Sequence, residues 1–215
     1  MDLSIVIVTY NSREEVEKCL LSIETNPPSC SYEIVVVDNA SSDGTPGFIS
    51  TRFPRVRVHA SGENPGYSRG VNKGISMTTG SYVLVLNPDI EVREGSIDVL
   101  KEFMDAHPRA GAAGSRLTFP DGTLQHSCRA FYTVRALFLR RTFLGKLFPR
   151  ARALREHLMT DYDHRESRQV DWIIGACMIV RRTAIDDVGP MDERFFLYFE
   201  DTDWCYRMKQ HGWQV

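Results

Sequence analysis

Cysteine is scarce in this chain, and the few cysteines stand far apart. Five occur in 215 residues, and none forms a CxxC pair with another. Zinc ribbons and dithiol redox sites need such pairs, and a disulfide framework needs an even number of cysteines. The pattern therefore predicts reduced thiols, which are typical of a cytoplasmic protein.

Long apolar runs and a large excess of either charge are also missing. No apolar stretch reaches the roughly 18–20 residues that a membrane-spanning helix requires. Met1-Asp2 leads directly into a strand pattern without the basic and apolar regions of a signal peptide, so we expect none. The formal net charge of -2 argues against a protein dedicated to nucleic acid, and we expect no nucleic-acid partner.

Two glycine-rich nucleotide-binding motifs do not occur. No GxGxxG follows the first predicted strand, and the chain contains no GxxxxGK[ST]. The first absence argues against a dinucleotide-binding fold, and the second excludes P-loop NTPases. A ligand at the sheet edge must therefore be bound by carboxylates instead of a glycine-rich loop.

Strand and helix patterns alternate over the first hundred or so residues. Apolar runs at 3–10, 32–38 and 81–86 predict buried strands, and the alternation at 55–60 predicts a fourth. Helices are expected to begin after Ser12, where Glu15 completes a capping-box pattern, and to cover 66–77 and 96–106. Such alternation predicts an α/β fold with a mainly parallel sheet.

The pattern changes after residue 110. We expect two strands joined by a Pro-Asp-Gly turn within 111–127, one strand over 170–182, and a helix that Gly212 ends. The last three residues, Trp-Gln-Val, resemble the start of another strand. We therefore expect further residues of the fold beyond position 215.

Polar side chains follow three of the predicted parallel strands. They are Tyr10-Asn11, Asp38-Asn39 and Asn87-Pro88-Asp89, all at the carboxyl edge where open α/β sheets bind ligands. One polar residue after a strand is usually a turn or a cap, but three at one edge indicate a site. Asp89 is either such a turn residue or a rigidly held ligand for Mg²⁺ or Mn²⁺.

A second pair of carboxylates, Glu200-Asp201, begins a predicted helix after the aromatic run FFLYF. The helix dipole favours ionised carboxylates there, so both capping and chemistry remain open. Trp172 is open to the same question. It offers a flat face to a sugar ring, but it also suits a hydrophobic core.

Six segments carry a resemblance to a known family. They are IVIVTYN, EIVVVDNASSDGT, NPGYSRGVNKGI, YVLVLNPDI, WIIGACMIVRR and FFLYFEDTDWCYR, in this order. The chain resembles family 2 glycosyltransferases of the GT-A fold, most of all rhamnosyltransferase-like members that build bacterial polysaccharides. This implies a nucleotide-sugar-binding half at 1–110, with a parallel sheet flanked by helices, and an acceptor-binding half at 111–215 with a smaller mixed sheet.

The resemblance also implies how a nucleotide is bound. Asp38 would accept a hydrogen bond from N3–H of uracil or thymine, and Asp89 would hold the cation as the last carboxylate of a reduced DXD motif. An arginine of relatives is replaced by Val71, with Arg69 as a candidate substitute, and a histidine that completes their metal shell would lie beyond residue 215. The other nucleotide-binding residues implied are Thr9, Tyr10, Asn11, Asn64, Gly66, Asn72 and Asn87.

For the reaction, the resemblance implies that Asp201 is the base of an inverting transferase and that Glu200 supports it. Trp172, Gly175 and Ala176 would lie beside the donor sugar and the acceptor. The implied donor is a nucleoside-diphosphate sugar, with dTDP-rhamnose expected, and the implied acceptor is a saccharide or a polyprenyl-linked saccharide.

The segment 129–155 contains eight Lys and Arg residues, no acidic residue and several aromatic ones. It is either a solvated loop or an interfacial element that contacts anionic lipid at the inner face of the membrane.

The sequence also bears on two rival functions. A sugar-1-phosphate nucleotidylyltransferase would carry a glycine- and arginine-rich loop where this chain has TYNSREE. A catalytically silent nucleotide-sugar-binding or scaffold protein stays open, because only one carboxylate of the DXD motif is kept.

Overall fold

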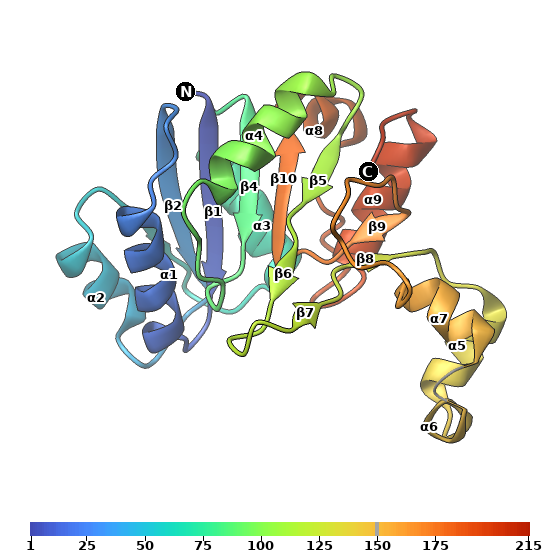
Figure 1. The fold of residues 1–215 in the computed structure, drawn as a ribbon. Helices are drawn as coiled ribbons and strands as arrows, with labels where there is room; N and C mark the ends of the chain where they lie inside the picture. The colour runs from blue at the N-terminus through green and yellow to red at the C-terminus, as the bar shows by residue number, and fades with distance from the viewer. Residues whose placement is uncertain (149–150) are drawn as a thin grey trace.

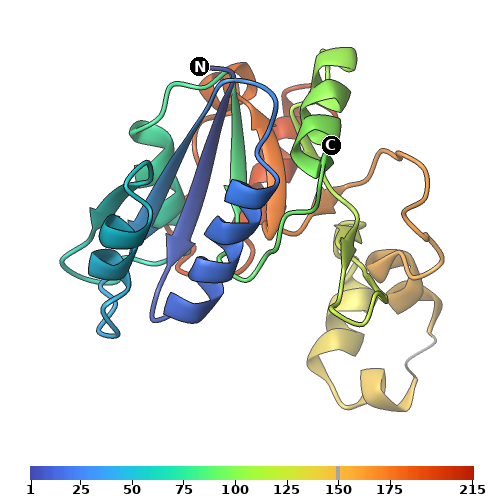
Figure 2. The same ribbon diagram turned by 60° about the vertical axis from the view of Figure 1, so that its left-hand side comes forward.

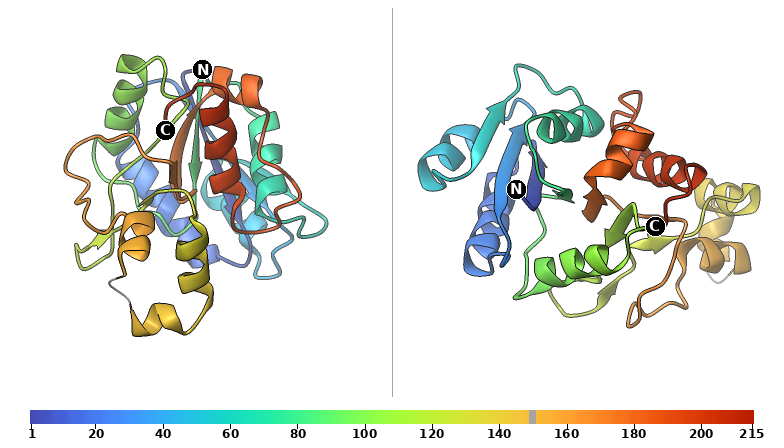
Figure 3. Two further views of the ribbon diagram at one scale, coloured as in Figure 1. Left: turned by 90° about the vertical axis from the view of Figure 1, so that its right-hand side faces the viewer. Right: turned by 90° about the horizontal axis from the view of Figure 1, so that it is seen from above.

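A six-stranded sheet lies between two layers of helices in the computed structural model, which describes residues 1–148 and 151–215 (Figures 1 and 3). The strand order is β3-β2-β1-β4-β10-β5; β1 to β4 are mutually parallel, and β10 is antiparallel to both β4 and β5. The predicted mainly parallel α/β sheet is thus confirmed. Its strands are β1 (Leu3–Thr9), β2 (Tyr32–Asp38), β3 (Arg57–Ala60), β4 (Tyr82–Leu86), β5 (Ala112–Gly114) and β10 (Cys177–Arg181).

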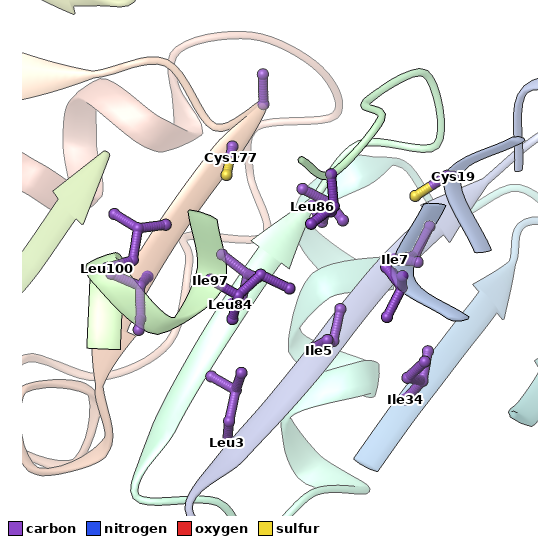
Figure 4. Close-up of a cluster of buried hydrophobic side chains, with 14 of the residues drawn as sticks. Leu3, Ile5, Ile7, Cys19, Ile34, Leu84, Leu86, Ile97, Leu100 and Cys177 are labelled. Carbon is purple, nitrogen blue, oxygen red and sulfur yellow. The ribbon is translucent and has the colours of Figure 1, made fainter. Parts of the chain in front are cut away.

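Both faces of the sheet are buried, which explains the continuous apolar runs in the sequence. In β1, Leu3, Ile5 and Ile7 pack on one face (Figure 4), and Val6 and Val8 pack on the other. The first face is covered by α1 (Arg13–Thr25), α2 (Thr45–Arg52) and α4 (Ser96–Ala106), and the second by α3 (Tyr67–Ser76), α8 (Arg182–Val188) and α9 (Glu200–Gln210).

Helix α3 lies unusually close to β1 because it presents glycines to the strand. A Cβ atom at Gly74 would lie 2.3 Å from Val6 Cγ1, and one at Gly70 would lie 2.8 Å from Val8 Cγ1. Any side chain at these positions would push α3 away from the sheet. The close packing fixes the start of α3 near the carboxyl edge of the sheet.

The second half adds two short antiparallel sheets and a helical projection. The sheets pair β6 (Leu117–Thr118) with β7 (Leu124–Gln125) across the predicted Pro-Asp-Gly turn, and β8 (Cys128–Arg129) with β9 (Trp172–Ile173). Figures 1 and 2 show the projection beside these sheets: α5 (Val134–Arg141), α6 (Leu144–Leu147) and α7 (Arg152–Leu158). Positions 149 and 150 of the basic segment lie outside the described residues. None of the described helices is both long and apolar enough to span a membrane.

Several local predictions were wrong. The expected loop after β2 contains α2, which has Pro46 and Gly47 in its first turn and no clear apolar stripe. Ser12 precedes α1 as predicted, but its hydroxyl bonds Thr9 Oγ1 at 2.7 Å and does not cap the helix. The single strand expected over 170–182 is two strands, β9 and β10, which belong to different sheets.

The C-terminal residues are extended, as predicted, and form a bridge to the end of the first half. Gln214 pairs with Ala110 in a parallel isolated bridge, and the Val170 amide donates to the carbonyl oxygen of Val215 at 2.9 Å.

Candidate active site

A cavity of about 1670 Å³ opens at the edge of the sheet where β4 ends and β10 begins. Because β10 is antiparallel to β4, its first residues lie beside the last residues of β4, and the Asn87 amide donates to the Ala176 carbonyl oxygen at 2.9 Å. Both halves of the chain therefore line one cavity. The predicted site residues among its lining are Asn87, Asp89, Trp172, Gly175, Ala176, Glu200 and Asp201.

Asp201 is fixed by backbone groups on two sides. Its Oδ2 accepts from the Gly175 amide at 3.1 Å, and its Oδ1 accepts from the Thr202 amide at 2.7 Å. Burial raises the pKa of Asp201, and these hydrogen bonds oppose that shift. Asp201 is thus a rigid carboxylate whose raised pKa makes it a better proton acceptor than an exposed aspartate.

Glu200 lies beside Asp201 at the start of α9 and is only 5% exposed. Its Oε2 is buried and has no hydrogen-bond partner among the described residues. Burial, and then the negative charge of Asp201, raise the pKa of Glu200 to about 7. Near neutral pH this carboxyl group can therefore hold a proton and donate a hydrogen bond into the site.

The chain enters α9 through an uncommon backbone conformation. Tyr198 (φ 69°) and Phe199 (φ 73°) are consecutive non-glycine residues in the left-handed region, and both line the cavity. Each such residue costs on the order of 1–3 kcal/mol and persists only where the surrounding structure holds it. Here the strain turns the chain so that both carboxylates of α9 reach the cavity.

Tyr67 joins the two halves of the site and was not identified from the sequence. Its hydroxyl lies 2.9 Å from Asn87 Oδ1 and 3.2 Å from the Gly175 carbonyl oxygen. Burial, and the nearby carboxylates of Glu200, Asp201 and Asp89, raise the pKa of Tyr67, so the hydroxyl stays protonated as a donor. Its partner Gly175 is 108 residues away, and no local pattern records such a contact.

Asp89 is exposed and lines the cavity just past β4. No hydrogen bond or ion pair among the described residues engages its carboxylate, so both oxygens can accept a ligand. Within those residues no group of three or more His, Cys, Asp or Glu side chains is arranged to hold a metal. A single carboxylate is sufficient for Mg²⁺ when phosphate and water fill the other positions, so Asp89 fits a cation bound together with a diphosphate.

The predicted base-binding residues lie at the same sheet edge but outside the cavity lining. Thr9 and Asp38 are register partners at the ends of β1 and β2. Asp38 Oδ2 accepts from the Ser41 amide at 2.9 Å, whereas its Oδ1 is buried without a partner among the described residues. Tyr10 is exposed, and the Asn11 amide donates to Ser41 Oγ at 2.8 Å. Ser12 Oγ, bonded to Thr9, connects this group to the cavity.

Asn64, Gly66 and Asn72, the predicted nucleotide-binding residues around the start of α3, make contacts within the protein. Asn64 Oδ1 accepts from the Gly66 amide at 3.0 Å, and a Cβ at Gly66 would lie 2.7 Å from the Phe196 carbonyl oxygen. Both polar atoms of the Asn72 amide bind the backbone of Met191. These residues hold the loop before α9 against α3, none of them lines the cavity, and a nucleotide contact by them stays a prediction. Arg69 is likewise engaged at the surface, 3.4 Å from Glu193.

Trp172 is a core residue that also reaches the cavity, and its contact with a sugar ring stays a prediction. Its ring is buried in the hydrophobic core on the side of the sheet covered by α3, α8 and α9, and Nε1 donates to the Ala130 carbonyl oxygen at 3.1 Å, yet it also lines the cavity. The wall formed by β8 and α5 is basic, with Arg129, Arg140 and Arg141. Arg93, after β4, and Arg116, between β5 and β6, also line the cavity. None of these five arginines was predicted as a site residue.

The family model described as Glycosyl transferase family 2 matches residues 4–189. The chain belongs to glycosyltransferase family 2. This confirms the predicted family and identifies the protein as a transferase. Among curated relatives of this glycosyltransferase is the N-acetylglucosaminyl-diphospho-decaprenol L-rhamnosyltransferase of Mycobacterium tuberculosis, 34% identical over 98% of this chain and 71% of that enzyme. A low-salt glycan biosynthesis hexosyltransferase of Haloferax volcanii is 30% identical over 98% of this chain and 62% of that protein.

Solved structures share the fold of this glycosyltransferase. A mannosyltransferase from Pyrobaculum calidifontis in complex with GDP-Man and Mn²⁺ has a TM-score of 0.67 at 19% identity, covering 99% of this chain and 53% of that one. S. aureus TarS 1-349 in complex with UDP-GlcNAc has a TM-score of 0.63 at 18% identity, covering 97% and 53%. The GT-A fold predicted from the sequence is therefore confirmed, and the chain spans about half of these solved chains.

Proposed function

We propose that this glycosyltransferase moves a sugar from a nucleoside-diphosphate sugar to a lipid-linked saccharide in bacterial polysaccharide synthesis, with inversion at the anomeric carbon. The observation that carries the proposal is that one cavity is lined both by Asp89, just past β4, and by Glu200 and Asp201 at the start of α9. The name of the mycobacterial relative supports dTDP-rhamnose as the first donor to test and a sugar diphosphate lipid as the first acceptor.

The nucleotide-sugar is bound by residues 1–110 in this proposal. The buried, unpartnered Oδ1 of Asp38 is an acceptor suited to the N3–H of uracil or thymine, and the exposed ring of Tyr10 can stack on the base. Asp89 and the donor diphosphate hold Mg²⁺ or Mn²⁺, which when bound supplies positive charge against the leaving nucleoside diphosphate. Asn87 lies between this cation site and Tyr67.

Residues 111–215 bind the acceptor and supply the base. Asp201 takes the proton from the acceptor hydroxyl as the hydroxyl oxygen attacks the anomeric carbon from the face opposite the diphosphate. The new C–O bond forms as the bond to the diphosphate breaks, and the configuration inverts. The raised pKa of Glu200 lets it hold a proton near neutral pH, and in that form it adds no second charge beside Asp201, which favours the ionised form of Asp201. Trp172, Gly175 and Ala176 lie where the sugar rings meet the base.

We also propose that the segment 129–155 contacts the inner face of the membrane. The projection exposes large apolar side chains, among them Val134 (86% exposed) and Phe143 (71% exposed), next to Arg135, Arg141 and Lys146. Exposed apolar groups interleaved with cations suit an anionic lipid surface better than water. This contact would bring the cavity to a lipid-linked acceptor at the cytoplasmic face.

One reaction tests the function. The protein is incubated with dTDP-rhamnose, Mn²⁺ or Mg²⁺, and a GlcNAc-diphosphate lipid, and the product linkage is determined by NMR. Release of dTDP together with a product of inverted configuration supports the proposal. The protein could instead bind dTDP-rhamnose tightly but give no product and release no nucleotide from dTDP-, UDP- or GDP-sugars. That result would identify a nucleotide-sugar-binding protein without catalysis.

A further inference from the structure

The basic wall of the cavity is not explained by the donor or by the base. Arg129, Arg140 and Arg141 line it, and among the described residues none of the three lies within ion-pair distance of a carboxylate. Burial, and then the charge of Arg140, lower the pKa of Arg129, so two cations are held near each other. Such a pair is stabilised when an anion binds between or beside its members.

Arg140 is oriented by a neutral histidine. His157, 2% exposed, contacts the Ala130 carbonyl oxygen through Nδ1 at 2.7 Å, so Nδ1 carries the hydrogen. Its Nε2 lies 3.1 Å from Arg140 Nη1 and must be the acceptor, because a guanidinium group has no acceptor atom. Burial and the charges of Arg140 and Arg129 lower the pKa of His157 and keep the ring neutral.

The second hydrogen of Arg140 Nη1 points to Tyr132, whose hydroxyl oxygen lies at 2.9 Å. Nη1 is thus fully used, and no hydrogen bond or ion pair among the described residues engages Nε or Nη2, although the guanidinium carbon lies 5.7 Å from the centre of the Tyr132 ring. Arg129 donates one hydrogen from Nη1 to the Cys128 carbonyl oxygen at 2.8 Å, and its other N–H groups have no such partner. The two guanidinium groups are therefore held in place by neutral groups while most of their donors remain free.

We propose that Arg129 and Arg140, with Arg141, bind the diphosphate of a diphosphate-linked acceptor, at a site separate from the donor diphosphate at Asp89. This rests on the proposed function and adds to it the residues that bind the acceptor diphosphate. Guanidinium groups match phosphate oxygens with paired hydrogen bonds, and a diphosphate offers enough oxygens for several.

The position of the arginines distinguishes acceptor from donor. Arg140 and Arg141 are on α5, whose exposed side carries Val134 and Phe138, so a lipid tail leaving the diphosphate would pass along the proposed membrane face. Arg129 is the register partner of Trp172 and lies close enough for the charge of Asp201 to act on its pKa. A sugar attached directly to the diphosphate would therefore reach the base with a ring hydroxyl.

The site is tested by binding, without turnover. Isothermal titration with farnesyl diphosphate and with inorganic pyrophosphate is carried out in EDTA, so that no cation recruits either probe to Asp89. Arg129→Gln and Arg140→Gln are each expected to weaken both probes about tenfold or more. Arg135→Gln, on the same helix but outside the cavity lining, is the matched control and should stay within about twofold of the unaltered protein.

Three results would overturn the site. In the first, Arg129→Gln and Arg140→Gln bind both probes as tightly as the unaltered protein does. In the second, Arg135→Gln weakens binding of the probes as much as the cavity variants do, which would mean that only overall charge matters. The variants could also weaken dTDP in Mn²⁺ as much as farnesyl diphosphate, which would assign the arginines to the donor. Arg140 and Arg141 are exposed, so Arg140→Gln and Arg141→Gln carry the test if Arg129→Gln does not fold.

The outcome is separable from the transfer reaction. Arginine-dependent binding of farnesyl diphosphate by a protein that transfers no sugar would leave the site standing and remove the proposed function. If the protein transfers sugar to a diphosphate lipid and the arginine variants transfer it equally well, the proposed function stands and the arginine site is removed.

Discussion

The backbone amide of Gly175 donates a hydrogen bond to the carboxylate of Asp201 at 3.1 Å. This bond ties the first turn of α9 to the segment that separates β9 from β10. The Tyr67 hydroxyl reaches the carbonyl oxygen of the same glycine. Gly175 therefore connects the base Asp201 to Tyr67, and Tyr67 in turn bonds Asn87 just past β4. A change in any of these contacts is expected to disturb proton transfer before it disturbs the fold.

Replacing Asp201 with Asn should lower kcat by about 10²–10⁴-fold, because the amide cannot accept the acceptor proton. Donor affinity should change little, since Asp201 begins α9, whereas the predicted base-binding residues Thr9 and Asp38 end β1 and β2 outside the cavity lining. The measurement is dTDP release at saturating donor, with dTDP-rhamnose binding measured separately. Asp203→Asn on the same helix is the control, because Asp203 pairs with Arg207 at 2.8 Å and does not line the cavity. Equal loss in both variants would show that the helix, and not the base, matters.

Glu200 should make the protein less stable as pH rises. Its pKa is raised from 4.5 to about 7, so between these values the folded state holds a proton that the unfolded chain has released. The free energy of unfolding therefore falls as pH rises through this window and levels off above it. Glu200→Gln removes this dependence.

The comparison is made by urea unfolding at pH 5 and pH 8. The Gln variant should gain stability relative to the unaltered protein by up to roughly 3 kcal/mol across this range. Asp201 titrates in both proteins, so the difference between them reports Glu200 together with its charge interaction with Asp201. A constant difference at the two pH values would mean that the Glu200 carboxyl is not held neutral in the folded protein.

Asp89→Asn should uncouple the cation from the nucleotide. In the unaltered protein, Mn²⁺ is expected to increase the thermal stabilisation that dTDP gives, because cation and diphosphate bind together at Asp89. The variant should keep the stabilisation by dTDP alone and lose the added effect of Mn²⁺. Glu91→Gln, which also lines the cavity, is the comparison for a general loss of negative charge. A full Mn²⁺ effect in Asp89→Asn would place the cation elsewhere.

Much of the sheet could be predicted from the sequence because its strands are buried on both faces. The β1 run at Leu3–Thr9 and the helix at Ser96–Ala106 were predicted nearly at their observed bounds. Helix α2 was missed because only Thr45 and Ile49 are buried in it, which leaves no apolar stripe to detect. The division of 170–182 into two strands was missed because the apolar pattern continues on both sides of Gly175, although β9 before it and β10 after it belong to different sheets.

The carboxylates of the site could be predicted because each follows a recognisable strand or begins a helix. Tyr67 and the arginines could not, since what makes them part of the site is contact across the fold. Arg129 gains its position from strand pairing with Trp172, 43 residues later, and Arg140 from His157 on another helix. The sequence indicated a basic segment, but only the packing of α5 and β8 shows which of its cations line the cavity.

The projection should bind anionic vesicles through its apolar side chains. Phe138 and Phe143 are exposed on α5 and in the connection to α6, and transferring such rings from water into the lipid interface is favourable by up to about 1.5–3 kcal/mol each. Replacing both with Ser should weaken binding to vesicles containing phosphatidylglycerol at least tenfold in a sedimentation assay. Their exposure means that the unfolding midpoint should not change.

Val99→Ser on α4 is the matched control, because Val99 is 65% exposed but lies on a helix away from the projection. Vesicles of phosphatidylcholine alone should bind the unaltered protein more weakly, and added salt should weaken binding to the anionic vesicles because it screens the Lys and Arg residues. Binding that is equal for the double variant would show that Phe138 and Phe143 do not contact the membrane, and binding that is indifferent to lipid charge would show that the Lys and Arg residues do not.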